Sequence, residues 1–223
     1  MNIMNQIMTA NVATNIYWLG RYLERVESTL LEINNTYDSI IDVDFDAGKT
    51  LYSNLGIELS YESASDFIHE AILGDHDANL KQLLDFIREN AIISRSYIDL
   101  DAFGSVIQLH DLFVTIASSE EKVDFAFIDD ALSLISEIWG EFTRNETRNV
   151  DDYFLKLGKY VEKVDFHLRV GKNKEYAIRM KDEIDEIVYV LAPRARVKPY
   201  RIHDSVEKIL EIINSKLALI VTE

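Results

Sequence analysis

The sequence predicts an all-α protein, a single multi-helix bundle of about eight helices that spans residues 1–223. Apolar residues recur every three or four positions through most of the chain, which is the spacing of amphipathic helices. Turn residues are scarce, with 8 glycines and 2 prolines, and this favours long helices over many short strands. One segment with helical spacing also occurs twice, near the start and in the last third of the chain.

The first helix is expected from about residue 11 to about 41, with Asn11 as its N-cap. Its apolar face carries Leu19, Tyr22, Leu23, Val26 and Leu30. An Asp-rich segment, 42–48, ends the helix, and residues 49–59 fit either a short helix or an irregular connection.

The remaining helices are placed by caps and apolar spacing. Their expected ranges are about 60–73, 75–98, 99–117, 125–143, 150–170, 173–191 and 204–217. Gly74 suits a left-handed position after the first of these, and Asp75 or Asp77 is expected to open the next. Both prolines, Pro193 and Pro199, lie in one late loop.

The repeated segment reads Tyr-Trp-Leu-Gly-Arg-Tyr-Leu-Glu-Arg-Val-Glu at 17–27 and Phe-Leu-Lys-Leu-Gly-Lys-Tyr-Val-Glu-Lys-Val-Asp at 154–165. Positions 19–27 align with 157–165 without a gap. Leu, Gly, Tyr, Glu and Val recur unchanged, and the other positions keep their charge or apolar character. We interpret this as an internal duplication, in which the two motif helices pack against each other about a pseudo-twofold axis.

A helical projection separates the charges of the motif. One flank of each copy carries the glycine and the acids: Gly20, Glu24 and Glu27 in the first, and Gly158, Glu162 and Asp165 in the second. The other flank carries Arg21 and Arg25, or Lys159 and Lys163. Glycine costs up to ~1 kcal/mol inside a helix, so its presence in both copies predicts the close approach of a backbone or a ligand. The four carboxylates could then face one another across the axis.

Three interpretations of this arrangement stay open. In the first, which we favour, Glu24 and Glu162 belong to a structural ion network with basic groups of partner helices, and Arg95 is a candidate partner. In the second, the four basic motif residues line an anion- or peptide-binding groove. In the third, Glu24 and Glu162 form an acid/base or divalent-metal site, although the motif lacks the Glu-x-x-His pairs of di-iron bundles.

Two further candidates lie outside the motif. The only basic island of the chain is 193–201, and it could receive a phosphate or an acidic partner segment, or complement the acidic bundle itself. Its cations are Arg194, Arg196, Lys198 and Arg201. Glu62, Asp66 and His69 share one helical stripe, which we interpret as a solvated polar face rather than a metal site. No metal and no cofactor is therefore predicted.

Composition limits the classes of binding partner and of chemistry that the chain can have. A formal net charge of -16 disfavours nucleic acid and anionic membranes. The chain has no cysteine, which excludes disulfides and thiolate chemistry and suits a reducing compartment. No uninterrupted apolar stretch approaches ~18 residues, and the N-terminus lacks the pattern of a secretory signal, so we expect no membrane span. The formation of a homo-oligomer stays open as an alternative.

The chain resembles the Alpha-E domain family, an all-helical family named for a Glu-Arg motif. Residues 15–27 resemble its opening signature, Arg88-Glu89-Asn90-Ala91 with Ser94-Arg95 its middle segment, and 154–165 its second signature. Two departures stand out: the connection after the first helix is short, and Lys159 and Lys163 stand where the family typically has Arg.

The resemblance implies a cytoplasmic bacterial or archaeal protein encoded beside ATP-grasp-like and transglutaminase-like proteins, which suggests peptide or amide-bond metabolism. We therefore expect a non-catalytic accessory or scaffold protein that acts with such partners. The alternative is an enzyme that uses Glu24 and Glu162, with or without a divalent metal, on a peptide or amide.

Overall fold

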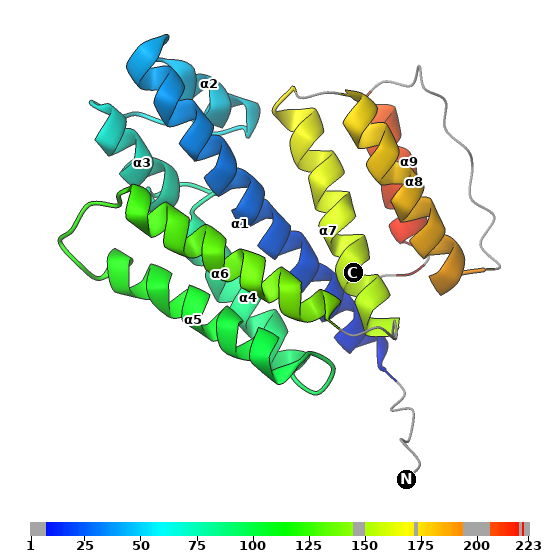
Figure 1. The fold of residues 1–223 in the computed structure, drawn as a ribbon. Coiled ribbons are helices and arrows are strands. Elements are labelled where there is room, and N and C mark those ends of the chain that lie inside the picture. Colours follow the sequence, from blue (N-terminus) through cyan, green and yellow to red (C-terminus); the bar gives the residue numbers. More distant parts are fainter. Residues whose placement is uncertain (1–7, 145–149, 172–173, 194–205, 219, 221–223) are drawn as a thin grey trace.

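The computed structural model describes residues 8–144, 150–171, 174–193, 206–218 and 220, and in these residues the fold is all-helical, as predicted (Figure 1). Nine helices lie in the described part of the chain, one more than expected. They are α1 (Ala10–Asp42), α2 (Ala47–Asn54), α3 (Ala64–Leu73), α4 (Leu80–Ile93), α5 (Leu100–Ala117), α6 (Phe125–Thr143), α7 (Val150–Arg169), α8 (Lys174–Leu191) and α9 (Val206–Leu217).

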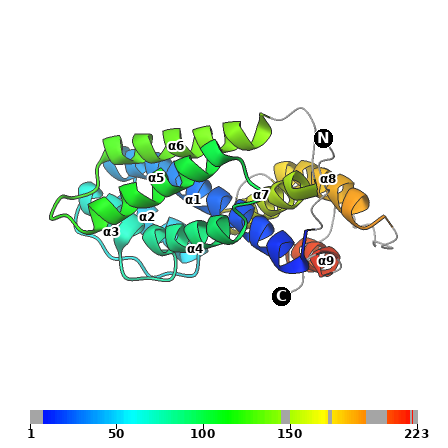
Figure 2. The same cartoon turned by 90° about the horizontal axis from the view of Figure 1, so that it is seen from below.

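The longest helix, α1, with 33 residues, is the centre of the bundle. It packs against α2, α3, α4, α6 and, most extensively, α7. Leu19, Leu23, Val26 and Leu30 are fully buried along it, as their spacing predicts, whereas Tyr22 is only half-buried and stacks between Trp18 and Phe86. Helices α8 and α9 lie on the side of α7 away from α5 in both views (Figures 1 and 2).

The motif helices agree closely with their expected ranges. α1 begins at Ala10 and α7 covers Val150–Arg169. The N-cap of α1 is Thr9 rather than Asn11, because the Thr9 hydroxyl accepts a hydrogen bond from the Val12 amide at 3.3 Å.

The turn between α3 and α4 corrects two expectations. Gly74 has φ -57°, so it is not left-handed. The N-cap of α4 is Asn79 rather than Asp75 or Asp77. Its Oδ1 accepts from the Gln82 amide at 3.0 Å, while its Nδ2 donates to the carbonyls of Leu73 and Gly74. A carboxylate could only accept, so the amide is what joins the end of α3 to the start of α4.

The segment 49–59, for which the sequence left a short helix or an irregular connection open, contains most of helix α2. Contacts with residues distant in sequence stabilise this helix. The Gly48 amide donates to the Tyr61 hydroxyl at 3.2 Å, and a Cβ at Gly48 would lie 2.6 Å from the Phe67 ring. The Tyr61 hydroxyl in turn donates to the Phe45 carbonyl. A helix of eight residues is marginal by itself, so these tertiary contacts stabilise it.

Among the described residues, one helix, α5, is long and apolar enough to cross a membrane by length and composition alone. It packs against α4 and α6 and has Val106, Leu109 and Phe113 fully buried, although only 28% of its residues are buried.

Candidate functional site

The two motif helices cross at their glycines. A Cβ at Gly20 would overlap the carbonyl oxygen of Leu155 on α7, and a Cβ at Gly158 would overlap the carbonyl oxygen of Tyr17 on α1. Tyr17 and Leu155 occupy aligned positions of the repeat, so the two contacts are reciprocal. The expected close approach of a backbone is therefore confirmed. Duplication of the chain itself stays a prediction.

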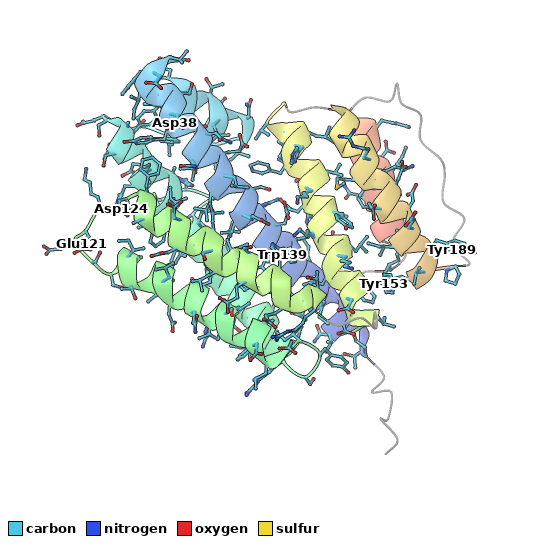
Figure 3. All side chains as sticks on the ribbon, in the orientation of Figure 1. Asp38, Glu121, Asp124, Trp139, Tyr153 and Tyr189 are labelled. Atoms are coloured by element: carbon cyan, nitrogen blue, oxygen red, sulfur yellow. The ribbon has the colours of Figure 1, made fainter. Side chains whose placement is uncertain are left out.

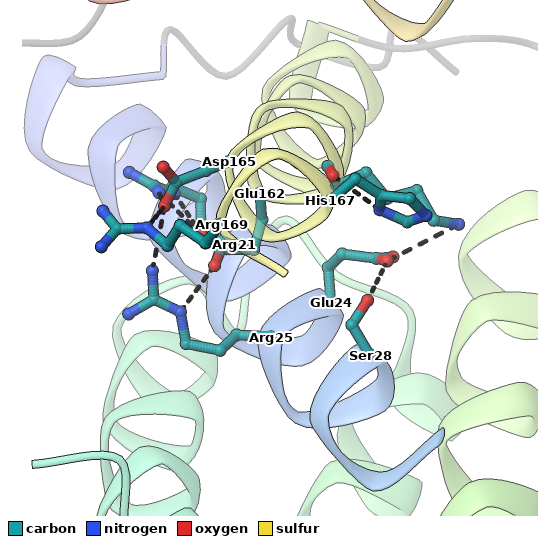
Figure 4. A network of polar contacts seen from close by, with 9 residues as sticks. Arg21, Glu24, Arg25, Ser28, Glu162, Asp165, His167 and Arg169 are labelled. Carbon is teal, nitrogen blue, oxygen red and sulfur yellow. Dashed lines mark hydrogen bonds and ion pairs between the residues drawn. The ribbon is translucent and has the colours of Figure 1, made fainter. Parts of the chain in front are cut away.

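On one side of the crossing, Glu162 of α7 is paired with two arginines of α1 (Figure 4). Its Oε2 accepts from Arg21 Nε at 2.8 Å and forms an ion pair with Arg21 Nη2 at 2.6 Å, and its Oε1 accepts from Arg25 Nε at 2.5 Å. Only 1% of Glu162 is exposed. Both oxygens of this buried carboxylate thus have charge-assisted hydrogen bonds.

Asp165 extends this arginine cluster by one turn. Its Oδ2 accepts from Arg169 Nε at 3.1 Å and lies 3.7 Å from Arg21 Nη2 and 3.6 Å from Arg25 Nη2. Three guanidinium groups therefore surround two buried carboxylates, Glu162 and Asp165.

On the other side, Glu24 of α1 faces two lysines of α7. Lys163 Nζ lies 3.6 Å from Oε1 and Lys159 Nζ 3.9 Å from Oε2, and both distances exceed those of ordinary hydrogen bonds. Ser28 Oγ donates to Oε1 at 2.9 Å, whereas Oε2 is buried without a hydrogen bond. Burial raises the pKa of Glu24 from its ordinary 4.5 to about 7, and the nearby Lys163 and Lys159 only partly oppose this effect.

A tryptophan from α6, Trp139, completes the lysine side (labelled in Figure 3). Lys159 Nζ lies 3.6 Å from the centre of its ring, and its Nε1 donates to Glu27 Oε2 at 2.8 Å. Burial lowers the pKa of Lys159, and the carboxylates of Glu24 and Glu27 oppose this shift. Trp139 thus connects α6 to both motif helices through a cation–π contact and a hydrogen bond.

The expectation that four carboxylates face one another is wrong. The acidic flank of each motif helix instead lies against the basic flank of the other. Glu24 faces Lys159 and Lys163, and at the aligned positions Glu162 faces Arg21 and Arg25.

Arg95, the expected partner of a motif carboxylate, lies elsewhere. It is exposed, and its guanidinium stands 5.2 Å from the Phe103 ring centre. Glu24 and Glu162 are therefore paired by the motif's own cations rather than by the middle segment.

The polar stripe of Glu62, Asp66 and His69 has a structural use at the start of α3. Ser63 is the N-cap and accepts from the Asp66 amide at 3.1 Å, while the Asp66 carboxylate accepts from the Glu62 amide at 3.0 Å. Arg194, Arg196, Lys198 and Arg201 lie outside the described residues.

One acidic group of the described residues, Asp99, Asp101 and Glu141, has metal-like spacing. Arg144 supplies a cation to this group, with Nη1 2.6 Å from Glu141 and 3.4 Å from Asp101. An arginine thus already balances part of this acidic charge.

A family comparison agrees with the resemblance seen in the motif. The model of Alpha-E, described as a predicted alpha-helical domain with a conserved ER motif, matches residues 8–213 of the 223. The chain belongs to the Alpha-E family. Searches of curated proteins and of solved structures found no match. Glu24 and Arg25 are the adjacent Glu-Arg pair of the first motif helix. In this Alpha-E protein they pair with two adjacent residues of α7, Glu24 with Lys163 and Arg25 with Glu162.

Three residues that donate hydrogen bonds to the motif carboxylates were not predicted from the sequence. Ser28 and Arg169 lie four residues after Glu24 and Asp165, and that helical spacing is a usable signal. Trp139 gives no such signal, because it joins the motif only through the packing of α6.

Proposed function

We propose that this Alpha-E protein is a non-catalytic accessory or scaffold protein of the cytoplasm, acting with ATP-grasp-like and transglutaminase-like partners in peptide or amide-bond metabolism. The partners and the compartment follow from the family resemblance of the motif. The geometry of the motif residues supports the non-catalytic role.

The observation that carries this proposal is the burial and pairing of both motif carboxylates. Glu24 and Glu162 are each 1% exposed, and each faces two cations from the opposite helix. A metal ligand or a general base must reach the metal or the substrate proton. Glu24 faces the crossing, and Glu162, which borders a cavity, has both oxygens paired with Arg21 and Arg25. Their chemistry is that of an ion network that fixes the register of α1 on α7.

A second candidate function, an enzyme that uses Glu24, has one observation in its favour. The pKa of Glu24 is raised to about 7, the range of a general acid or base at neutral pH. Burial causes that shift, and Glu24 does not line either of the cavities that reach Lys159 or Glu162. We therefore favour the structural role.

The proposal is tested by titrating wild type, Glu24→Gln and Glu162→Gln with divalent metals and nucleotides, and by assaying the ATP-grasp-like partner with each. We expect no metal- or nucleotide-dependent change in melting temperature. We also expect partner activity to depend on the presence of the Alpha-E protein but not on the Glu24 carboxylate. Turnover of a peptide or amide by the isolated protein, lost in a folded Glu24→Gln variant, would establish the enzyme instead.

A further inference from the structure

A cavity of about 210 Å³ opens beside the arginine cluster. It lies between α1, the connection that follows α2, the start of α4 and the last turns of α7. Its volume is below the roughly 300–1,000 Å³ of pockets for drug-sized ligands, so it suits a small molecule.

One wall of the cavity holds Arg25 and Arg169, together with the buried carboxylate of Glu162 that is already paired with Arg21 and Arg25. Arg25 uses its Nε for Glu162, and Arg169 uses its Nε for Asp165. The two side chains are 37% and 51% exposed. Because a guanidinium carries five N–H donors, both arginines keep donors that can bind an anion in the cavity.

The charges around this wall are separated across the cavity. The guanidinium groups of Arg21, Arg25 and Arg169 surround the carboxylates of Glu162 and Asp165, which leaves an excess of one positive charge within the cluster itself. Asp77, an exposed acid of the same lining, offsets this excess. The cavity therefore offers a cationic group to a ligand's anion and a carboxylate to a ligand's cation.

Much of the remaining lining is apolar. Leu83 and Phe166 are buried, and Leu55 and Ile57 are half-buried. Apolar side chains beside a cationic group fit a ligand that has both an apolar body and an anion, whereas inorganic phosphate offers no apolar surface to bury.

We propose that this cavity binds a small organic carboxylate, with its carboxylate at Arg25 and Arg169 and its apolar body against Leu83 and Phe166. This site goes beyond the proposed scaffold role, because it needs neither a partner nor the Glu24 carboxylate. Asp77 is an exposed residue of the lining and can accept from an ammonium group, so the carboxylate can belong to a simple acid or to a free amino acid.

The test uses the full chain and three probes of similar shape: 4-methylpentanoate, its neutral amide, and L-leucine. Binding is followed by chemical-shift changes and by melting temperature up to about 10 mM, which detects a Kd near 1 mM. We expect binding of at least one carboxylate and at least about tenfold weaker binding of the neutral amide. Leucine is expected to bind more tightly than 4-methylpentanoate where Asp77 holds the ammonium group, and Asp77→Asn should remove that difference.

Arg169→Gln should weaken carboxylate binding at least about tenfold, whereas Arg169→Lys, which keeps the charge, should lose less. The matched control is Arg144→Gln, an exposed arginine that pairs with Asp101 and Glu141 away from the cavity and should leave binding unchanged. Circular dichroism and melting confirm that each variant is folded. The proposal is overturned if wild type binds neither carboxylate, if the amide binds equally well, or if folded Arg169→Gln binds like wild type.

Discussion

Glu162 and Glu24 occupy aligned positions of the motif and are equally buried, yet their partners differ. The arginines of α1 reach both oxygens of Glu162 at 2.5–2.8 Å, whereas the lysines of α7 stay 3.6–3.9 Å from Glu24. A guanidinium is a planar fork that matches a carboxylate, while an ammonium is a point charge on a flexible stem. Burial therefore dominates at Glu24 and raises its pKa to about 7.

The difference shows that one backbone crossing can carry two kinds of ion pair. The glycine contacts are reciprocal, so they set the same helix separation for both sides. The identity of the cation then decides whether the buried carboxylate is fully hydrogen-bonded, as Glu162 is, or has an oxygen without a hydrogen bond, as Glu24 has.

The largest expected effect concerns the glycine crossing of α1 and α7, which the arginine side and the lysine side share. Gly20→Ala and Gly158→Ala should each cost about 3 kcal/mol or more of the free energy of unfolding, because a methyl group would overlap a backbone carbonyl of the other helix. Urea denaturation measures this loss. The matched control is Gly104→Ala in α5, where no atom lies within 4 Å of the new Cβ and where up to ~1 kcal/mol of stabilisation is expected. Similar results at all three glycines would contradict the close crossing.

The second expected effect is a dependence of stability on pH that comes from Glu24. Because the folded-state pKa of Glu24 lies above the ordinary 4.5, the folded protein holds this proton more tightly than the unfolded chain. The stability that Glu24 contributes is therefore fully present below about pH 4.5 and is lost as the pH rises through about 7.

Denaturation of wild type and Glu24→Gln between these pH values should show a relative loss of about 3 kcal/mol in wild type as pH rises. The groups that face Glu24 are Lys159, Lys163, Glu27 and Ser28, and all are retained in the variant. Parallel curves for the two proteins would show that Glu24 has no raised pKa.

The smallest expected effect comes from giving Glu24 an arginine partner like those of Glu162. Lys163→Arg should bring a forked donor to Glu24, lower the pKa of Glu24 below about 7, and add about 1 kcal/mol of stability near pH 8. The carbon-13 chemical shift of the Glu24 carboxyl group measures the pKa, and Lys156→Arg on the same helix is the control. An unchanged Glu24 titration would mean that the type of cation does not explain the difference.

Much of the fold follows from local signals in the sequence. Apolar spacing locates α1 and α7 to within a residue or two, since helical periodicity depends on neighbours along the chain. The glycines likewise predict a close helix crossing. α2 was left ambiguous, because its stability comes from Tyr61 and Phe67, which are distant in sequence.

The pairing within the site could not be predicted in the same way. The sequence places acids and bases on opposite flanks of each helix, but it does not fix how the two helices rotate about their contact. That rotation decides that Glu24 meets Lys163 rather than Glu162 or Arg95. It also brings in Trp139 from a helix that shares no pattern with the motif.

The central claim is that the motif carboxylates hold α1 on α7, and the unfolding free energy of Glu162→Gln at pH 7 tests it most directly. The substitution leaves two arginines facing a neutral amide, so we predict a loss of about 3 kcal/mol. Glu24→Gln, measured alongside, should lose about 1 kcal/mol or less, since Glu24 is already partly protonated at that pH. Unchanged stability in Glu162→Gln, or equal losses in the two variants, would contradict the account.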